Sequence, residues 1–127
     1  MQGLPARFFG TAVIYGILGM VLGNVMAATQ DHGQMPTHAH LMLIGWVSFS
    51  IFAFFYHLFP ARAGSLLAQL HFWLAQASYI VLIIGLYLIF DGKVEAGEPL
   101  ASVASIAYLV SMVLFAIVAL PALRRGT

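Results

Sequence analysis

Four long apolar runs joined by short linkers limit the folds that this chain can adopt. They cover about residues 8–28, 36–59, 65–90 and 100–120, each close to the roughly 20 residues that cross a bilayer as a helix. Short linkers make consecutive helices antiparallel neighbours. We therefore predict an all-α protein, a membrane four-helix bundle with a single integral membrane domain over residues 1–127. The first run exceeds the apolar part of a signal peptide, about 7–15 residues, so we interpret it as a span.

The composition excludes several classes of protein. Hydrophobic residues make up 62% of the chain and charged residues only 7%, whereas soluble domains carry charge on about 25% of positions. So few polar groups cannot cover a water-exposed surface, and we expect membrane lipid around the chain and no nucleic acid as a partner. The chain has no cysteine, which excludes disulfides, thiolate metal sites and iron–sulfur clusters.

The basic residues indicate how the spans are oriented. Arg7, Arg62, Arg124 and Arg125 fall on one side of the four-span arrangement, and only Lys93 falls on the other. Basic residues are enriched in cytoplasmic loops. We therefore predict a multi-pass protein of the bacterial inner (cytoplasmic) membrane with both termini in the cytoplasm. The start of the second span then lies near the outer surface.

Two histidines at that start are the first candidates for a functional site. His38 and His40 lie where the second run enters the membrane, and an ionisable residue inside a span is a functional hypothesis by default. On a helix the two side chains point about 200° apart. The two side chains cannot coordinate one metal ion together, but they can enter two pockets on opposite sides of the helix. The alternative is that an imidazole here only forms hydrogen bonds near the lipid headgroups.

Haem b is the cofactor that these residues best support, because neutral imidazole is a common axial ligand of haem iron. His71 is an alternative ligand, but it differs from His40 in depth by about 15 Å, and the axial ligands of one haem lie at similar depth. His57 and His71 are closer in depth and could hold a second haem. Alternatively, His71 forms an interhelical hydrogen bond with Gln69 or Gln76, and His57 extends to the membrane interface.

A different set of side chains at the outer end suits copper. His32, Met35 and His38 are spaced three residues apart, and thioether combined with imidazole is a ligand set for copper, especially in its reduced state. Methionine is also an ordinary filler of gaps in apolar packing. Copper is therefore an alternative to haem at this end of the chain.

Glycines in the first span favour close helix packing. Gly19 and Gly23 are four residues apart, a spacing that lets two helix backbones approach each other in lipid. The pair predicts a close neighbour without indicating whether that neighbour belongs to the same chain.

The second span resembles a known family over about residues 36–60. His38-Ala-His40-Leu, then Gly45-Trp46, then Phe-Tyr-His-Leu-Phe-Pro at residues 55–60 is similar to the second transmembrane helix of the haem-copper oxidase and nitric oxide reductase superfamily. In that family a histidine near the outer end of this helix binds the low-spin haem. The whole chain looks like the short four-helix proteins described as oxidase subunit I-like, so the resemblance implies a fold like one four-helix arc of that subunit.

The resemblance also implies an assembly. The family's catalytic subunit has twelve helices in three such arcs and three histidines for a copper ion, whereas this chain has helices for one arc and no such trio. Transposed to this chain, it implies a homo-oligomer, plausibly a trimer, in which the second helix offers His38 to one neighbour and His40 to the other.

The function that we expect is therefore that of a membrane cytochrome. Haem b would serve electron transfer if both axial positions are filled, with a respiratory-chain electron donor as partner, and O₂ or NO binding if one position is open. Whether the chain is an enzyme is left open, and proton-pumping oxygen reduction is not expected, because the spans lack carboxylates for a proton path. The alternatives are a copper-handling membrane protein and a structural small subunit of a respiratory complex.

Overall fold

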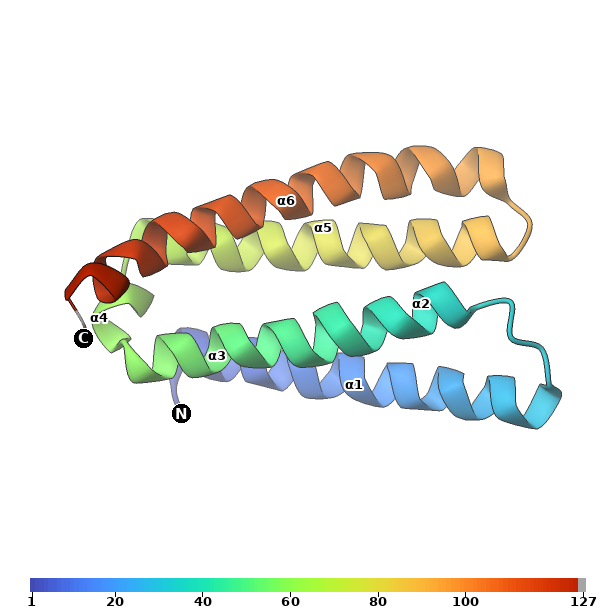
Figure 1. The fold of residues 1–127 in the computed structure, drawn as a ribbon, viewed down its shortest axis with the longest axis horizontal. Helices are drawn as coiled ribbons and strands as arrows, with labels where there is room; N and C mark the ends of the chain where they lie inside the picture. The colour runs from blue at the N-terminus through green and yellow to red at the C-terminus, as the bar shows by residue number, and fades with distance from the viewer. Residues whose placement is uncertain (126–127) are drawn as a thin grey trace.

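The computed structural model describes residues 1–125, which are helical with no strand in that part of the chain (Figure 1). The first and last long helices are α1 and α6. Between them the second membrane segment consists of three continuous pieces, α2, a π-helical segment η1 and α3, followed by the short α4 and the long α5. The bounds are α1 Gly3–Thr29, α2 Met35–His40, η1 Leu41–Ser48, α3 Phe49–Leu58, α4 Pro60–Ala63, α5 Leu66–Phe90 and α6 Val94–Arg125.

Four of these segments are long and apolar enough to cross a membrane, as predicted. They are Gly3–Thr29, Met35–Leu58, Leu66–Phe90 and Val94–Arg124. The all-α fold class and the multi-pass character are therefore confirmed. Proline lies within the first turn of α2, where its missing N–H costs no hydrogen bond.

The last helix differs from our expectation at both ends. We expected it to begin after Pro99 and to end at Pro121, but both prolines lie inside α6. Each proline removes one backbone hydrogen bond, but both lie near an end of the helix, where few turns depend on that bond. Proline is also tolerated in membrane helices because neighbouring groups satisfy the freed carbonyls.

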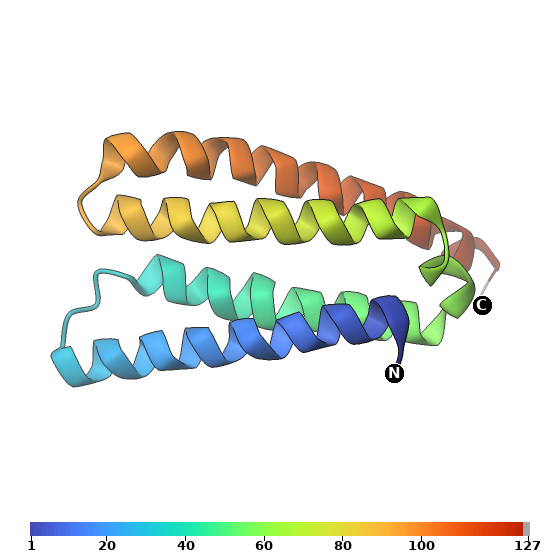
Figure 2. The same cartoon turned by 180° about the vertical axis from the view of Figure 1, so that it is seen from behind.

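The helices form two antiparallel hairpins that lie side by side (Figures 1 and 2). In the first, α1 packs along η1 and α3; in the second, α5 packs along α6 over its whole length. The second hairpin is closest at Gly85 and Gly97, where a Cβ on Gly85 would lie 2.7 Å from the backbone nitrogen of Ala101. Only glycine at both positions allows this approach of the two backbones.

Charge separates the two ends of the bundle. The end formed by the start of α1, α4 and the last turns of α6, which we term the basic end, carries Arg7, Arg62 and Arg124. The opposite end, which we term the acidic end, carries all four carboxylates and Lys93. Among the described residues the one ion pair, Lys93 Nζ to Asp91 Oδ2 at 3.3 Å, is at the acidic end. The carboxylates are Asp31, Asp91, Glu95 and Glu98.

Candidate functional site

His38 lies at the acidic end and packs against α1. Its Nδ1 is 2.7 Å from the carbonyl oxygen of Gly19. A carbonyl can only accept a hydrogen bond, so Nδ1 carries the proton and a neutral ring keeps a lone pair on Nε2. The ring lies on the surface that the predicted glycine pair leaves open, because a Cβ on Gly23 would be 2.9 Å from its Cε1. The neighbour expected at this pair is thus the second span of the same chain.

His40 has the same protonation pattern but a different partner. Its Nδ1 is 2.7 Å from the carbonyl oxygen of Pro36, one turn earlier in the same helix. The same argument puts the proton on Nδ1 and the lone pair on Nε2. Metal-binding histidines commonly donate Nδ1–H to a backbone carbonyl, because this hydrogen bond fixes the tautomer and the ring orientation.

The helix changes its geometry directly after His40. Residues Leu41–Ser48 form the π-helical segment η1, in which each carbonyl bonds to the fifth residue along instead of the fourth. The Tyr79 hydroxyl of α5 donates to the His40 carbonyl oxygen at 3.3 Å. Gly45 makes room for it, because a Cβ there would collide with the Tyr79 hydroxyl and lie 2.6 Å from the Cβ of Tyr15. This contact was not predicted from the sequence, although a glycine inside an apolar helix is often there for packing.

The two outer histidines do not form one site. His38 is held by α1 and His40 by its own helix, as the predicted divergence of their side chains requires. Both rings are half-buried. In the part of the chain that the structure describes, no group of three His, Cys, Asp or Glu side chains could hold a metal ion. The structure therefore offers two separate imidazole ligands rather than a preformed metal centre.

The chain matches no protein-family model, no curated protein and no solved structure. The resemblance of residues 36–60 to haem-copper oxidases therefore stays a prediction.

The residues expected for copper are spread over the loop and the helix start. His32 is exposed, and its Nδ1 is 3.3 Å from the carbonyl oxygen of Gln30. Met35 is exposed, and the Nδ1 of His38 is engaged by α1. No hydrogen bond among these three side chains is found in the described part of the chain.

His71 is fully buried near the basic end and is enclosed by aromatic rings. The ring centroids of Phe8, Phe52 and Phe115 lie 5.2, 4.6 and 5.1 Å from that of the imidazole. Its Nδ1 is 2.9 Å from the Tyr56 hydroxyl, and its Nε2 has no hydrogen-bond partner among the described residues. A haem iron has no path to this nitrogen in the packed cluster, so ligation by His71 requires the rings to open.

The prediction that His71 bonds to Gln69 or Gln76 was wrong. Its interhelical hydrogen bond is with the Tyr56 hydroxyl of α3. Gln76 instead accepts from the Tyr15 hydroxyl at 2.6 Å and donates to the Thr11 hydroxyl at 2.7 Å. These bonds tie α5 to α1 and so join the two hairpins. His57 is exposed and lies outside the aromatic cluster, so the structure does not bring it together with His71.

Proposed function

We propose that this chain is a membrane haem protein in which His38, His40 or both supply an axial nitrogen to haem b. One observation carries the proposal: Nδ1 of each ring donates to a backbone carbonyl, so Nε2 has an unused lone pair. Haem iron binds imidazole through such a nitrogen, and the bound haem would supply one-electron chemistry or diatomic-gas binding. The similarity of residues 36–60 to the second helix of haem-copper oxidases supports the same ligands.

The divergence of the two rings supports a homo-oligomer. Because His38 and His40 point to different sides of one helix, they cannot occupy the two axial positions of one iron. A second axial ligand would come from another copy of the chain, which suits the trimer that the resemblance implies. Two imidazoles on one iron favour electron transfer from a respiratory-chain donor, whereas one imidazole leaves a position for O₂ or NO.

The charge distribution supports the orientation that we propose. Positive charge gathers at the end that carries the start of α1 and the last turns of α6, and the Asp and Glu side chains gather at the other end. By the positive-inside rule the basic end faces the cytoplasm of a bacterium. The haem would then lie near the outer surface of the inner membrane.

Optical spectra of the purified, reduced protein test the proposal. The wild type should show sharp Soret and α bands if the iron is six-coordinate, or a spectrum sensitive to carbon monoxide if one position is open. His38→Ala and His40→Ala should each lose or alter the pigment. The matched controls are His57→Ala and His71→Ala, which should keep it.

Several results would contradict the proposal. These ligands would be excluded if the purified protein is colourless after growth with ample haem. They would also be excluded if the variant with alanine at both outer histidines keeps its full pigment. Loss of pigment only in His71→Ala would move the site to the aromatic cluster. A colourless protein that retains copper would favour the set His32, Met35 and His38, and one that retains neither would favour a structural subunit.

A further inference from the structure

A second candidate site lies at the basic end, far from the outer histidines. A cavity of about 680 Å³ opens there between the start of α1, the end of α3 and the turn from α4 to α5. Its walls are apolar at Leu4, Pro5 and Pro60, and polar at Arg7, His57 and Gln69. None of the residues that line it is acidic. A cavity of this size lies within the range of about 300–1,000 Å³ typical of small-molecule sites.

Arg7 is held at this cavity by neutral partners. Its Nη2 donates to Oε1 of Gln69 at 2.9 Å, and its guanidinium carbon lies 5.0 Å from the centre of the Phe72 ring. Both contacts fix the guanidinium, but neither neutralises its charge. A guanidinium has five N–H donors, and this hydrogen bond uses one of them. Because the side chain is already positioned, binding an anion costs less side-chain entropy.

Among residues 1–125, no acidic side chain lies at this end. All four Asp and Glu side chains lie at the acidic end. From Arg7, α1 continues for 22 residues to Thr29, which at 1.5 Å per residue is about 33 Å. At that distance a charge in salt solution is screened. No acidic side chain of the described residues therefore pairs with Arg7, which leaves its guanidinium available to an external anion.

We propose that this cavity binds the phosphate of an anionic phospholipid. Arg7 would pair with the phosphate oxygens, for which the planar guanidinium is suited, and an imidazole nitrogen of His57 would donate a further hydrogen bond. The proline and leucine walls would contact the glycerol and the upper acyl chains. A lipid rather than free phosphate is favoured because the cavity lies at the end of membrane-spanning helices, where basic pockets recruit anionic headgroups. The proposal does not depend on haem binding.

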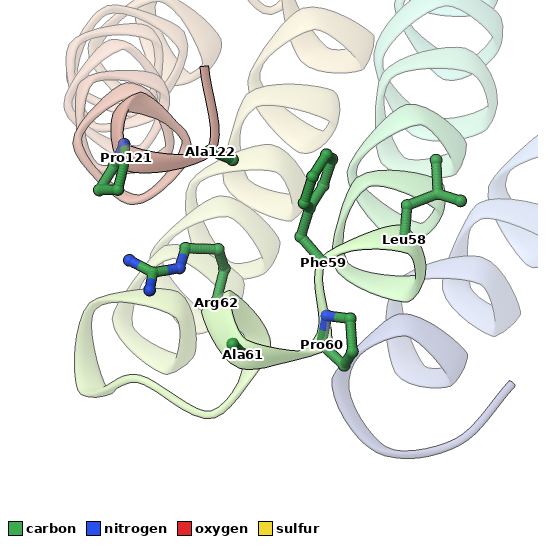
Figure 3. A pocket seen from close by; sticks show the side chains of 7 residues that line it. All are labelled: Leu58, Phe59, Pro60, Ala61, Arg62, Pro121 and Ala122. Atoms are coloured by element: carbon green, nitrogen blue, oxygen red, sulfur yellow. The ribbon is translucent and has the colours of Figure 1, made fainter. Parts of the chain in front are cut away.

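A neighbouring cavity provides a matched control. It has a volume of about 360 Å³, lies at the same basic end and contains Arg62 (Figure 3). The Arg62 side chain extends away from Phe59 and Pro60, and no histidine or glutamine lines this cavity. Arg62→Gln therefore removes the same charge from the same end and leaves the proposed site intact.

The test is native mass spectrometry of the full chain in detergent, titrated with phosphatidylglycerol. Wild type and Arg62→Gln should retain the lipid equally, and Arg7→Gln should bind it about 10-fold more weakly, as expected for the loss of a charge-assisted hydrogen bond. Phosphatidylcholine, which has no net charge, should bind more weakly than phosphatidylglycerol to the wild type. If Arg7→Gln does not fold, His57→Leu changes an exposed residue of the same cavity and should also weaken binding.

Several outcomes would overturn the proposal. If Arg7→Gln and Arg62→Gln weaken phosphatidylglycerol binding equally, binding depends only on the net charge of this end. If the wild type binds phosphatidylcholine as strongly as phosphatidylglycerol, the negative charge of the lipid does not contribute to binding. Displacement of phosphatidylglycerol by inorganic phosphate at comparable concentration would identify a free-phosphate site instead of a lipid site.

Discussion

Replacing Gly23 by alanine tests the position of His38, on which the proposed haem site depends. The new methyl group would lie 2.9 Å from Cε1 and 3.3 Å from Nδ1 of His38. Carbon atoms in contact are about 3.5–4.0 Å apart, so the ring must withdraw from α1 by about 0.6–1 Å. The bond from Nδ1 to the carbonyl oxygen of Gly19, now 2.7 Å, would then exceed the usual limit of about 3.2 Å.

Loss of that hydrogen bond should reduce the free energy of unfolding by about 0.5–1.5 kcal/mol. Glycine to alanine in a helix also brings a gain of about 0.5–1 kcal/mol, so a control is needed. Gly10→Ala provides it, because a Cβ at Gly10 meets nothing within 4 Å. We expect Gly23→Ala to be about 1 kcal/mol less stable than Gly10→Ala.

Two measurements read out this effect. Unfolding by sodium dodecyl sulfate in mixed micelles gives the stability difference, and nitrogen-15 spectra of labelled histidine report whether Nδ1 of His38 still carries its proton. Pigment bound through His38 should fall in parallel. If Gly23→Ala matches Gly10→Ala in stability and leaves the His38 signals unchanged, the ring does not lie on this surface of α1.

Three further variants test the packing of the bundle by the same unfolding titration. Gly97→Val should lower the free energy of unfolding by about 1–3 kcal/mol, because even a Cβ there would lie 2.8 Å from the backbone nitrogen of Ile89. An unchanged unfolding midpoint would contradict the close approach of α5 and α6. His71→Phe should cost about 1–3 kcal/mol because the Tyr56 hydroxyl loses its hydrogen-bond partner. Adding Tyr56→Phe should recover part of this loss, whereas additive losses would argue against the bond. Gln76→Leu removes two interhelical hydrogen bonds, each of which contributes about 0.6 kcal/mol in lipid. A variant as stable as the wild type would show that these bonds contribute nothing.

The sequence predicted the parts of the fold that depend on local composition. Each apolar run is long enough to specify a membrane helix by itself, and the structure has four such helices. Helical geometry also predicts that His38 and His40 diverge, and the two rings have different partners, the Gly19 carbonyl of α1 and the Pro36 carbonyl of their own helix. The bounds of α6 were less well predicted, because Pro99 and Pro121 act as helix breakers in water but lie within a helix here.

The contacts between distant segments could not be predicted. Periodicity gives little information in a chain whose helices are apolar on every face, so it did not indicate that His71 faces Tyr56 or that Gln76 bridges to α1. Gly45 lies within the π-helical segment and closely approaches Tyr79, 34 positions later in the sequence. Such a pairing becomes visible only when the two hairpins are placed together.

The hydrogen bonds of the histidines differ in what they determine. Nδ1 of His71 is 2.9 Å from the Tyr56 hydroxyl, which can donate or accept, so both tautomers of His71 are compatible with this contact. The ring lies among aromatic side chains, with Phe52 nearly perpendicular at 84°, and its Nε2 has no hydrogen-bond partner among the described residues. His38 and His40 instead have backbone carbonyls as partners, which place the proton on Nδ1 and a lone pair on Nε2, and we propose that haem iron takes this lone pair.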